Sequence, residues 1–107
     1  MVLSIKDSAH LEEQLTAAGD KLVVIDFYAT WCGPCKVIAP KIDEYSEEFP
    51  DVIFVKVDVD ECDDIAVKYN VNSMPTFLFI KNNTMLETVV GANAGKIKTT
   101  IEKHRLA

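Results

Sequence analysis

The chain has 107 residues, 49% of them apolar, and a formal net charge of −6 at neutral pH. Its length supports one hydrophobic core, so we expect a single domain over residues 1–107. The acidic balance argues against nucleic acid and anionic membranes, whose binding depends on clustered Lys and Arg side chains. The odd number of cysteines favours a reducing compartment, and we expect neither a secretory signal nor a membrane span, because the apolar runs are short.

Apolar spacing and turn residues predict strands that alternate with helices. Continuous apolar runs predict buried strands, whereas apolar residues three or four positions apart predict helices. Such an alternation implies a parallel sheet covered on both faces, and a late hairpin adds antiparallel strands, so the fold class is α/β. In chain order we expect a strand at 2–5, a helix from Asp7 or Ser8 to Gly19, a strand at 22–29, a helix at 34–49, a strand at 52–57, a short helix opening at Asp60, a strand at 76–80, a turn at 81–84, a strand at 85–90 and a helix at 94–104.

Two cysteines, separated by Gly33 and Pro34, lie between the second expected strand and the helix that follows it. Residues three apart on a helix are neighbours, so Cys32 and Cys35 can form a disulfide with little backbone movement. The helix start offers unpaired N–H groups and partial positive charge, which favour a thiolate. We expect Cys32 to be an exposed nucleophile and Cys35, one turn further in, to be less exposed. A packed structural pair and a pair of metal ligands are the alternatives.

Asp26 interrupts an otherwise apolar strand shortly before the first of these cysteines. Burial of a carboxylate is costly, so its pKa should rise, and it could take a proton from Cys35 through water. The alternative is a solvated carboxylate at the edge of the sheet. Lys56 interrupts another apolar strand in the same way. It either lies near Asp26 and tunes it or reaches solvent from the end of the sheet.

Three other side chains each have a functional or a structural interpretation to be considered. Trp31, the only tryptophan, is either an exposed contact surface for substrates or a core residue. Cys62 shares the apolar face of the short helix, where a cysteine either packs as a small hydrophobe or serves redox regulation. His104 lies far from the cysteine pair, and we expect it to be solvated.

These motifs together resemble the thioredoxin family. The match runs through Asp26, residues 29–36, Met74-Pro75-Thr76 and Gly91-Ala92-Asn93, and it covers essentially the whole chain. The residues around Cys62 are most similar to those of cytosolic animal thioredoxins. The resemblance implies the thioredoxin fold, a five-stranded mixed sheet with strand order 1-3-2-4-5 flanked by four helices.

The resemblance also implies an activity, protein-disulfide reduction without a bound cofactor or metal. Cys32 would attack the substrate disulfide, Cys35 would resolve the mixed disulfide, and Asp26 would assist proton transfer. Gly33 and Pro34, with Lys56, would tune the redox properties, and central Gly-Pro points to a reductant. The Met74–Pro75 bond would be cis. The residues that would form the substrate groove are Trp31, Met74, Pro75, Gly91 and Ala92.

The partners are likewise implied by the resemblance. A thioredoxin reductase would supply electrons from NADPH, and the targets would include peroxiredoxins, ribonucleotide reductase and methionine sulfoxide reductases, in support of cell redox homeostasis. The expected location is the cytoplasm, with the nucleus as a second site, and the expected state is a monomer, with a weak dimer as the alternative. Ser73 stands where vertebrate thioredoxins carry a cysteine, so a covalent dimer through that position is excluded. A zinc-binding module and a redox-switched binding protein are the other classes considered.

Overall fold

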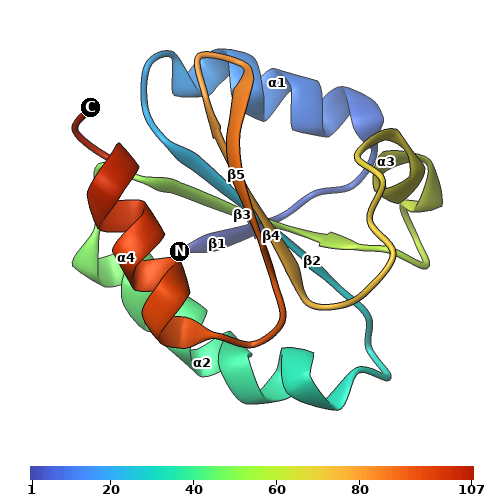
Figure 1. The fold of residues 1–107 in the computed structure, drawn as a ribbon. Helices are drawn as coiled ribbons and strands as arrows, with labels where there is room; N and C mark the ends of the chain where they lie inside the picture. Colours follow the sequence, from blue (N-terminus) through green and yellow to red (C-terminus); the bar gives the residue numbers. More distant parts are fainter.

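Five strands form one sheet in the order β1-β3-β2-β4-β5, which confirms the order implied by the resemblance. The computed structural model describes residues 1–107, and Figure 1 shows its four helices arranged around this sheet. The elements are β1 (Val2–Ser4), α1 (Ser8–Ala18), β2 (Val23–Tyr28), α2 (Gly33–Glu48), β3 (Ile53–Asp58), α3 (Asp63–Lys68), β4 (Thr76–Lys81), β5 (Thr84–Val90) and α4 (Ala94–His104).

Strand β2 lies at the centre of the sheet. It pairs in parallel with β3 and antiparallel with β4, while β1 extends the parallel side and β5 the antiparallel side. In this register Asp26 stands opposite Lys56 on β3 and Phe77 on β4. Asp26 is therefore not at the sheet edge, which rules out the solvated edge carboxylate considered above.

The sheet separates two hydrophobic cores. Successive residues of a strand point to opposite faces, so Val23 and Ile25 pack beneath α1 and α3, whereas Val24 packs against α2 and α4. Figure 1 shows the same division, with α1 and α3 on one side of the sheet and α2 and α4 on the other. Asp26 has the same parity as Val24, so its carboxyl group faces the layer that contains α2.

Local sequence signals explain several element boundaries. The side chain of Asp7 caps α1 by accepting a hydrogen bond from the backbone N–H of His10, at 2.8 Å. Asn82 and Asn83 adopt φ angles of 52° and 59° in the turn between β4 and β5. Asparagine tolerates this left-handed backbone, as the prediction of a hairpin at this point required.

Helix α3 begins at Asp63, later than the predicted start at Asp60. The side chain of Asp58 accepts hydrogen bonds from the backbone N–H groups of Asp60 and Glu61, at 2.9 and 3.4 Å. These bonds hold the chain in a turn that competes with helix formation. The acidic residues expected to open the helix therefore belong to the loop before it.

His104 also differs from the prediction. Its side chain is only 17% exposed and contacts the carboxylate of Glu87 on β5, so it is not a solvated residue. Nearby, the ammonium of Lys81 donates to the carbonyl oxygens of His104 and Ala107, at 3.0 and 2.7 Å. These contacts fasten the end of α4 to the hairpin. None of the four helices has the length and apolar character needed to cross a bilayer.

Candidate active site

A disulfide joins Cys32 and Cys35 at the start of α2, with their Cα atoms 5.3 Å apart. Cys32 is the N-cap residue, and its Sγ accepts a hydrogen bond from the backbone N–H of Cys35 at 3.2 Å. Pro34 occupies the first turn, where its missing N–H costs nothing. The cysteine pair therefore sits in the positive field of a helix N-terminus, which stabilises a thiolate at Cys32 when the disulfide is reduced.

Both cysteines are buried in this disulfide form, contrary to the prediction of an exposed Cys32. The exposed fractions are 4% for Cys32 and 6% for Cys35, so the expected difference between them is absent as well. Ala29 and Met74 pack against the pair. The Sγ of Cys32 lies 3.7 Å from the carbonyl oxygen of Met74, a residue brought to the site by the chain before β4.

The residues that flank Cys32 along the chain are uncharged and exposed. Trp31 is 67% exposed, so it is not a core residue, and Gly33 and Pro34 are exposed beside it. The indole Nε1 of Trp31 donates a hydrogen bond to the carboxylate of Asp60 at 2.9 Å. This contact fixes the edge of the ring and leaves a large part of its surface free.

Apart from Trp31, the residues expected to form a groove lie on the chain segments at either end of the β4–β5 hairpin. The Met74–Pro75 peptide bond is cis, which confirms the expectation from the resemblance. The backbone N–H of Gly91 donates to the carbonyl oxygen of Pro75 at 2.8 Å, so the two segments are held side by side. Gly91 has a φ of 100°, a conformation that favours glycine, and Ala92 beyond it is exposed.

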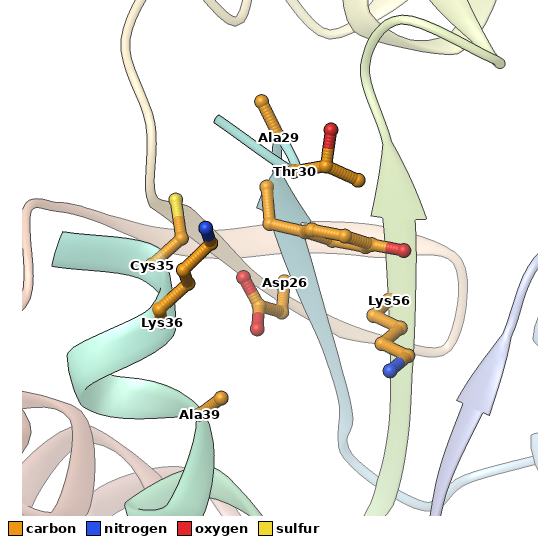
Figure 2. A pocket seen from close by; sticks show the side chains of 8 residues that line it. Asp26, Ala29, Thr30, Cys35, Lys36, Ala39 and Lys56 are labelled. Atoms are coloured by element: carbon orange, nitrogen blue, oxygen red, sulfur yellow. The ribbon is translucent and has the colours of Figure 1, made fainter. Parts of the chain in front are cut away.

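A cavity of about 280 Å³ lies between β2, β3 and the first turns of α2. Asp26 is 8% exposed, and its Oδ1 is buried without a hydrogen-bond partner in the protein. Figure 2 shows the Asp26 carboxyl group between Cys35 and Lys36 on one side and Lys56 on the other. Burial raises the pKa of Asp26 to about 7, the Lys56 ammonium opposes that rise, and the carboxylate of Asp43 adds to it.

Lys56 is half-buried and lines the same cavity as Asp26. Of the two alternatives for this lysine, the structure therefore favours a position close to Asp26. Its ammonium lies over the ring of Tyr28, with Nζ 5.6 Å from the ring centroid. Tyr28 and Asp60 were not singled out in the sequence. Tyr28 could have been found from its spacing, because it lies two residues after Asp26 on the same strand and therefore shares a face with it.

Cys62 lies away from the disulfide, in the core beneath α1 and α3. It is 3% exposed, and its thiol lies 3.5 Å from the carbonyl oxygen of Lys6. Burial raises the pKa of this thiol, and nearby carboxylates add to the effect, which makes it a poor nucleophile. The surroundings are those of a packed small hydrophobe. The structure contains no group of three or more His, Cys, Asp or Glu side chains arranged to hold a metal ion.

This topology, with a disulfide at the start of a helix that follows a central strand, defines a class of proteins, the thiol–disulfide oxidoreductases. A family model described as Thioredoxin matches residues 2–103, so the chain belongs to the thioredoxin family. The protein is accordingly a thiol–disulfide oxidoreductase with its cysteine pair in place.

Individual relatives agree with this assignment. Thioredoxin-T of Drosophila melanogaster is 57% identical over 105 residues, which cover 97% of this chain and 67% of that protein. Thioredoxin of Homo sapiens is 48% identical over 103 residues, with 96% and 98% of the two chains covered. The X-ray structure of Fasciola hepatica thioredoxin matches with a TM-score of 0.95 and 43% identity, over 96% of this chain and 99% of that one.

Proposed function

We propose that this protein is a general protein-disulfide reductase that receives electrons from NADPH through a thioredoxin reductase. The observation that carries the proposal is the Cys32–Cys35 disulfide, closed at a helix N-terminus and flanked by the exposed indole of Trp31. Such a pair can alternate between dithiol and disulfide without any bound cofactor. Family membership supports the proposed reductase and its use of NADPH.

The proposed reaction has two exchange steps. The thiolate of Cys32 attacks one sulfur of a substrate disulfide, which forms a mixed disulfide and releases the other substrate sulfur as a thiolate. Cys35 then attacks the Sγ of Cys32, which breaks the mixed disulfide and releases the second substrate sulfur. Two electrons pass to the substrate, and the Cys32–Cys35 disulfide remains. Gly33, Pro34 and Lys56 tune the stability of this disulfide relative to the dithiol.

Asp26 is the proposed acceptor of the Cys35 proton. A neutral thiol attacks poorly, so Cys35 must lose its proton in the second step. A pKa of about 7 suits a group that both accepts and returns protons near neutrality. The cavity between Asp26 and Cys35 has room for water, through which the proton would pass.

The proposed substrate groove consists of Trp31, Met74, Pro75, Gly91 and Ala92. An extended peptide would lie along it and pair with the backbone of Met74, as an added strand does at a sheet edge. The position of the Met74 carbonyl oxygen beside Cys32 supports this, because a bound peptide would then carry its disulfide to the nucleophile. The uncharged lining is consistent with a broad range of substrates.

The partners proposed are peroxiredoxins, ribonucleotide reductase and methionine sulfoxide reductases, together with the reductase itself. We propose that residues 1–107 act as one domain and as a monomer, in the cytoplasm and also in the nucleus, where the protein would contribute to redox homeostasis. The high identity to animal thioredoxins supports these assignments.

The decisive experiment is reduction of insulin with NADPH and a thioredoxin reductase, with and without this protein. We expect NADPH consumption that depends on the protein and disappears in the Cys32→Ser variant. A folded protein that dithiothreitol keeps reduced, yet that never accelerates insulin reduction, would contradict disulfide-reductase activity. Activity with dithiothreitol but not with any thioredoxin reductase would contradict only the proposed electron source.

A further inference from the structure

Four side chains on neighbouring strands form a compact group on the face of the sheet beneath α2. Asp26 and Tyr28 lie two apart on β2, and Lys56 and Asp58 lie two apart on β3, so all four share one face. In the register of the strands Asp26 stands opposite Lys56, and Tyr28 stands opposite Asp58. The ring of Tyr28 is thus a diagonal neighbour of Lys56, close enough to contact its ammonium.

The Lys56 ammonium contacts the aromatic ring of Tyr28. Nζ lies 5.6 Å from the centroid of the Tyr28 ring, within the range of a cation–π interaction. None of the six ion pairs of the structure includes Lys56. Only one carboxylate oxygen of Asp58, Oδ1, is engaged, by the backbone N–H groups of Asp60 and Glu61, and Asp58 forms no ion pair with Lys56.

The location of this ammonium matters for Asp26. Besides Lys56 on β3, the titratable groups that face the Asp26 cavity are Tyr28 on β2 and Lys36 on α2, whereas Cys35 on α2 is in the disulfide and does not titrate. Asp43 on α2 also acts on Asp26, whereas β4 contributes the uncharged Phe77. Lys56 is the cation that offsets burial and the charge of Asp43.

We propose that Tyr28 is a positioning residue that holds the Lys56 ammonium at the Asp26 cavity and thereby sets the pH at which Asp26 exchanges its proton. The proposal rests on the role proposed above for Asp26 in the reaction. A lysine ammonium is strongly hydrated and sits on a flexible stem, so without the ring it would move into bulk water. Asp26 would then lose the positive charge that favours its ionised form.

The test follows the Asp26 carboxyl carbon by NMR during a pH titration of the oxidised, aspartate-labelled protein. In Tyr28→Leu the midpoint should rise by roughly half a pH unit. In Tyr28→Phe, which keeps the ring and removes only the hydroxyl, it should stay at the wild-type value. In a Lys56→Met background the Tyr28→Leu change should produce no further rise, because the cation that the ring positions is gone.

Three results would overturn the proposal: an unchanged or lowered midpoint in Tyr28→Leu, an equal rise in Tyr28→Phe, or the same rise in the Lys56→Met background. A measurement on the wild type tests the proposal even if the Tyr28→Leu variant does not fold. The ε-methylene protons of Lys56 should resonate upfield of those of the exposed Lys6, owing to the ring current of Tyr28. Shifts equal to those of Lys6 would also overturn the proposal.

These measurements use neither substrate nor reductase, so they separate the two proposals. If Asp26→Asn leaves turnover unchanged, the proton-transfer role of Asp26 fails while its titration still reports on Tyr28. If the Asp26 midpoint is the same in Tyr28→Leu and the wild type while Asp26→Asn slows turnover, only the positioning role of Tyr28 fails.

Discussion

Asp26 and Cys35 lie on different elements, β2 and α2, yet they line the same cavity of about 280 Å³. The carboxyl oxygen Oδ1 of Asp26 has no hydrogen-bond partner within the protein, and its burial raises the pKa of the group to about 7. A buried carboxyl group without a partner destabilises the sheet. Groups of this kind are found most often at functional sites. Its position in the same cavity as Cys35 supports the role proposed for it in proton transfer.

Replacement of Asp26 by asparagine should slow the release of substrate. The amide cannot accept the Cys35 proton, so turnover at pH 7 should fall by roughly a hundredfold, the low end of general-base effects. Insulin reduction measured between pH 5 and pH 9 would show it, with the wild-type dependence around pH 7 lost in the variant. Asp20→Asn, at an exposed position beyond α1, is the matched control and should behave as the wild type. Wild-type turnover in Asp26→Asn would contradict the role.

The same substitution should change how stability depends on pH. The folded pKa of about 7 lies above the ordinary 3.8, so the stabilising protonated form dominates at low pH and is lost as pH rises through 7. The wild type should therefore lose roughly 4 kcal/mol relative to Asp26→Asn between pH 4 and pH 8. Urea unfolding of both proteins at several pH values measures this difference. A difference that does not vary with pH would show that the pKa of Asp26 is the same in the folded and the unfolded protein.

The two cysteines should fail in different ways when changed to serine. Cys32→Ser removes the attacking sulfur, so no adduct with a substrate should form and activity should vanish. Cys35→Ser leaves the first step intact and removes the second, so mixed disulfides should accumulate. Mass spectrometry under non-reducing conditions distinguishes the outcomes. Adducts on Cys32→Ser, or none on Cys35→Ser, would reverse or refute the assignment.

Loss of the Trp31–Asp60 hydrogen bond should loosen the indole without unfolding the site. In Asp60→Ala we expect kcat/KM for a protein disulfide to fall roughly two- to tenfold, the range of one hydrogen bond. The fluorescence anisotropy of the sole tryptophan should fall as well, because the ring gains motion. Glu61→Gln is the control, since this neighbour makes no contact with Trp31 among the hydrogen bonds of its loop. Unchanged anisotropy in Asp60→Ala would contradict the positioning of the ring by Asp60.

Much of the fold could be predicted because local signals agreed with one another. The apolar run of β2 indicated a strand buried on both faces, and asparagines marked the hairpin turn. The strand order and the cis bond before Pro75 came from the resemblance alone, because no local pattern determines either. The order of strands depends on how the helices cross the sheet, which periodicity does not encode.

The wrong predictions concern contacts between distant parts of the chain. Cys32 is buried because Met74, 42 residues later, packs against it, and the motif itself carries no sign of that contact. The start of α3 was misplaced because the Asp58 side chain accepts from the backbone N–H groups of Asp60 and Glu61 and holds these residues in a turn before the helix. Tyr28 and Asp60 were overlooked for a related reason: their importance comes from partners that only the tertiary structure reveals.

The central register of β2 has a consequence for folding. A slip of one residue against β3 and β4 would turn every side chain of β2 to the opposite face. Asp26 would then be forced into the apolar layer beneath α1, far from its cavity, while Phe27 would be driven out of that layer. Such a misaligned sheet would carry an isolated acid among hydrocarbon side chains and be heavily penalised. Asp26 destabilises the native sheet at neutral pH, and it thus also disfavours this misaligned sheet.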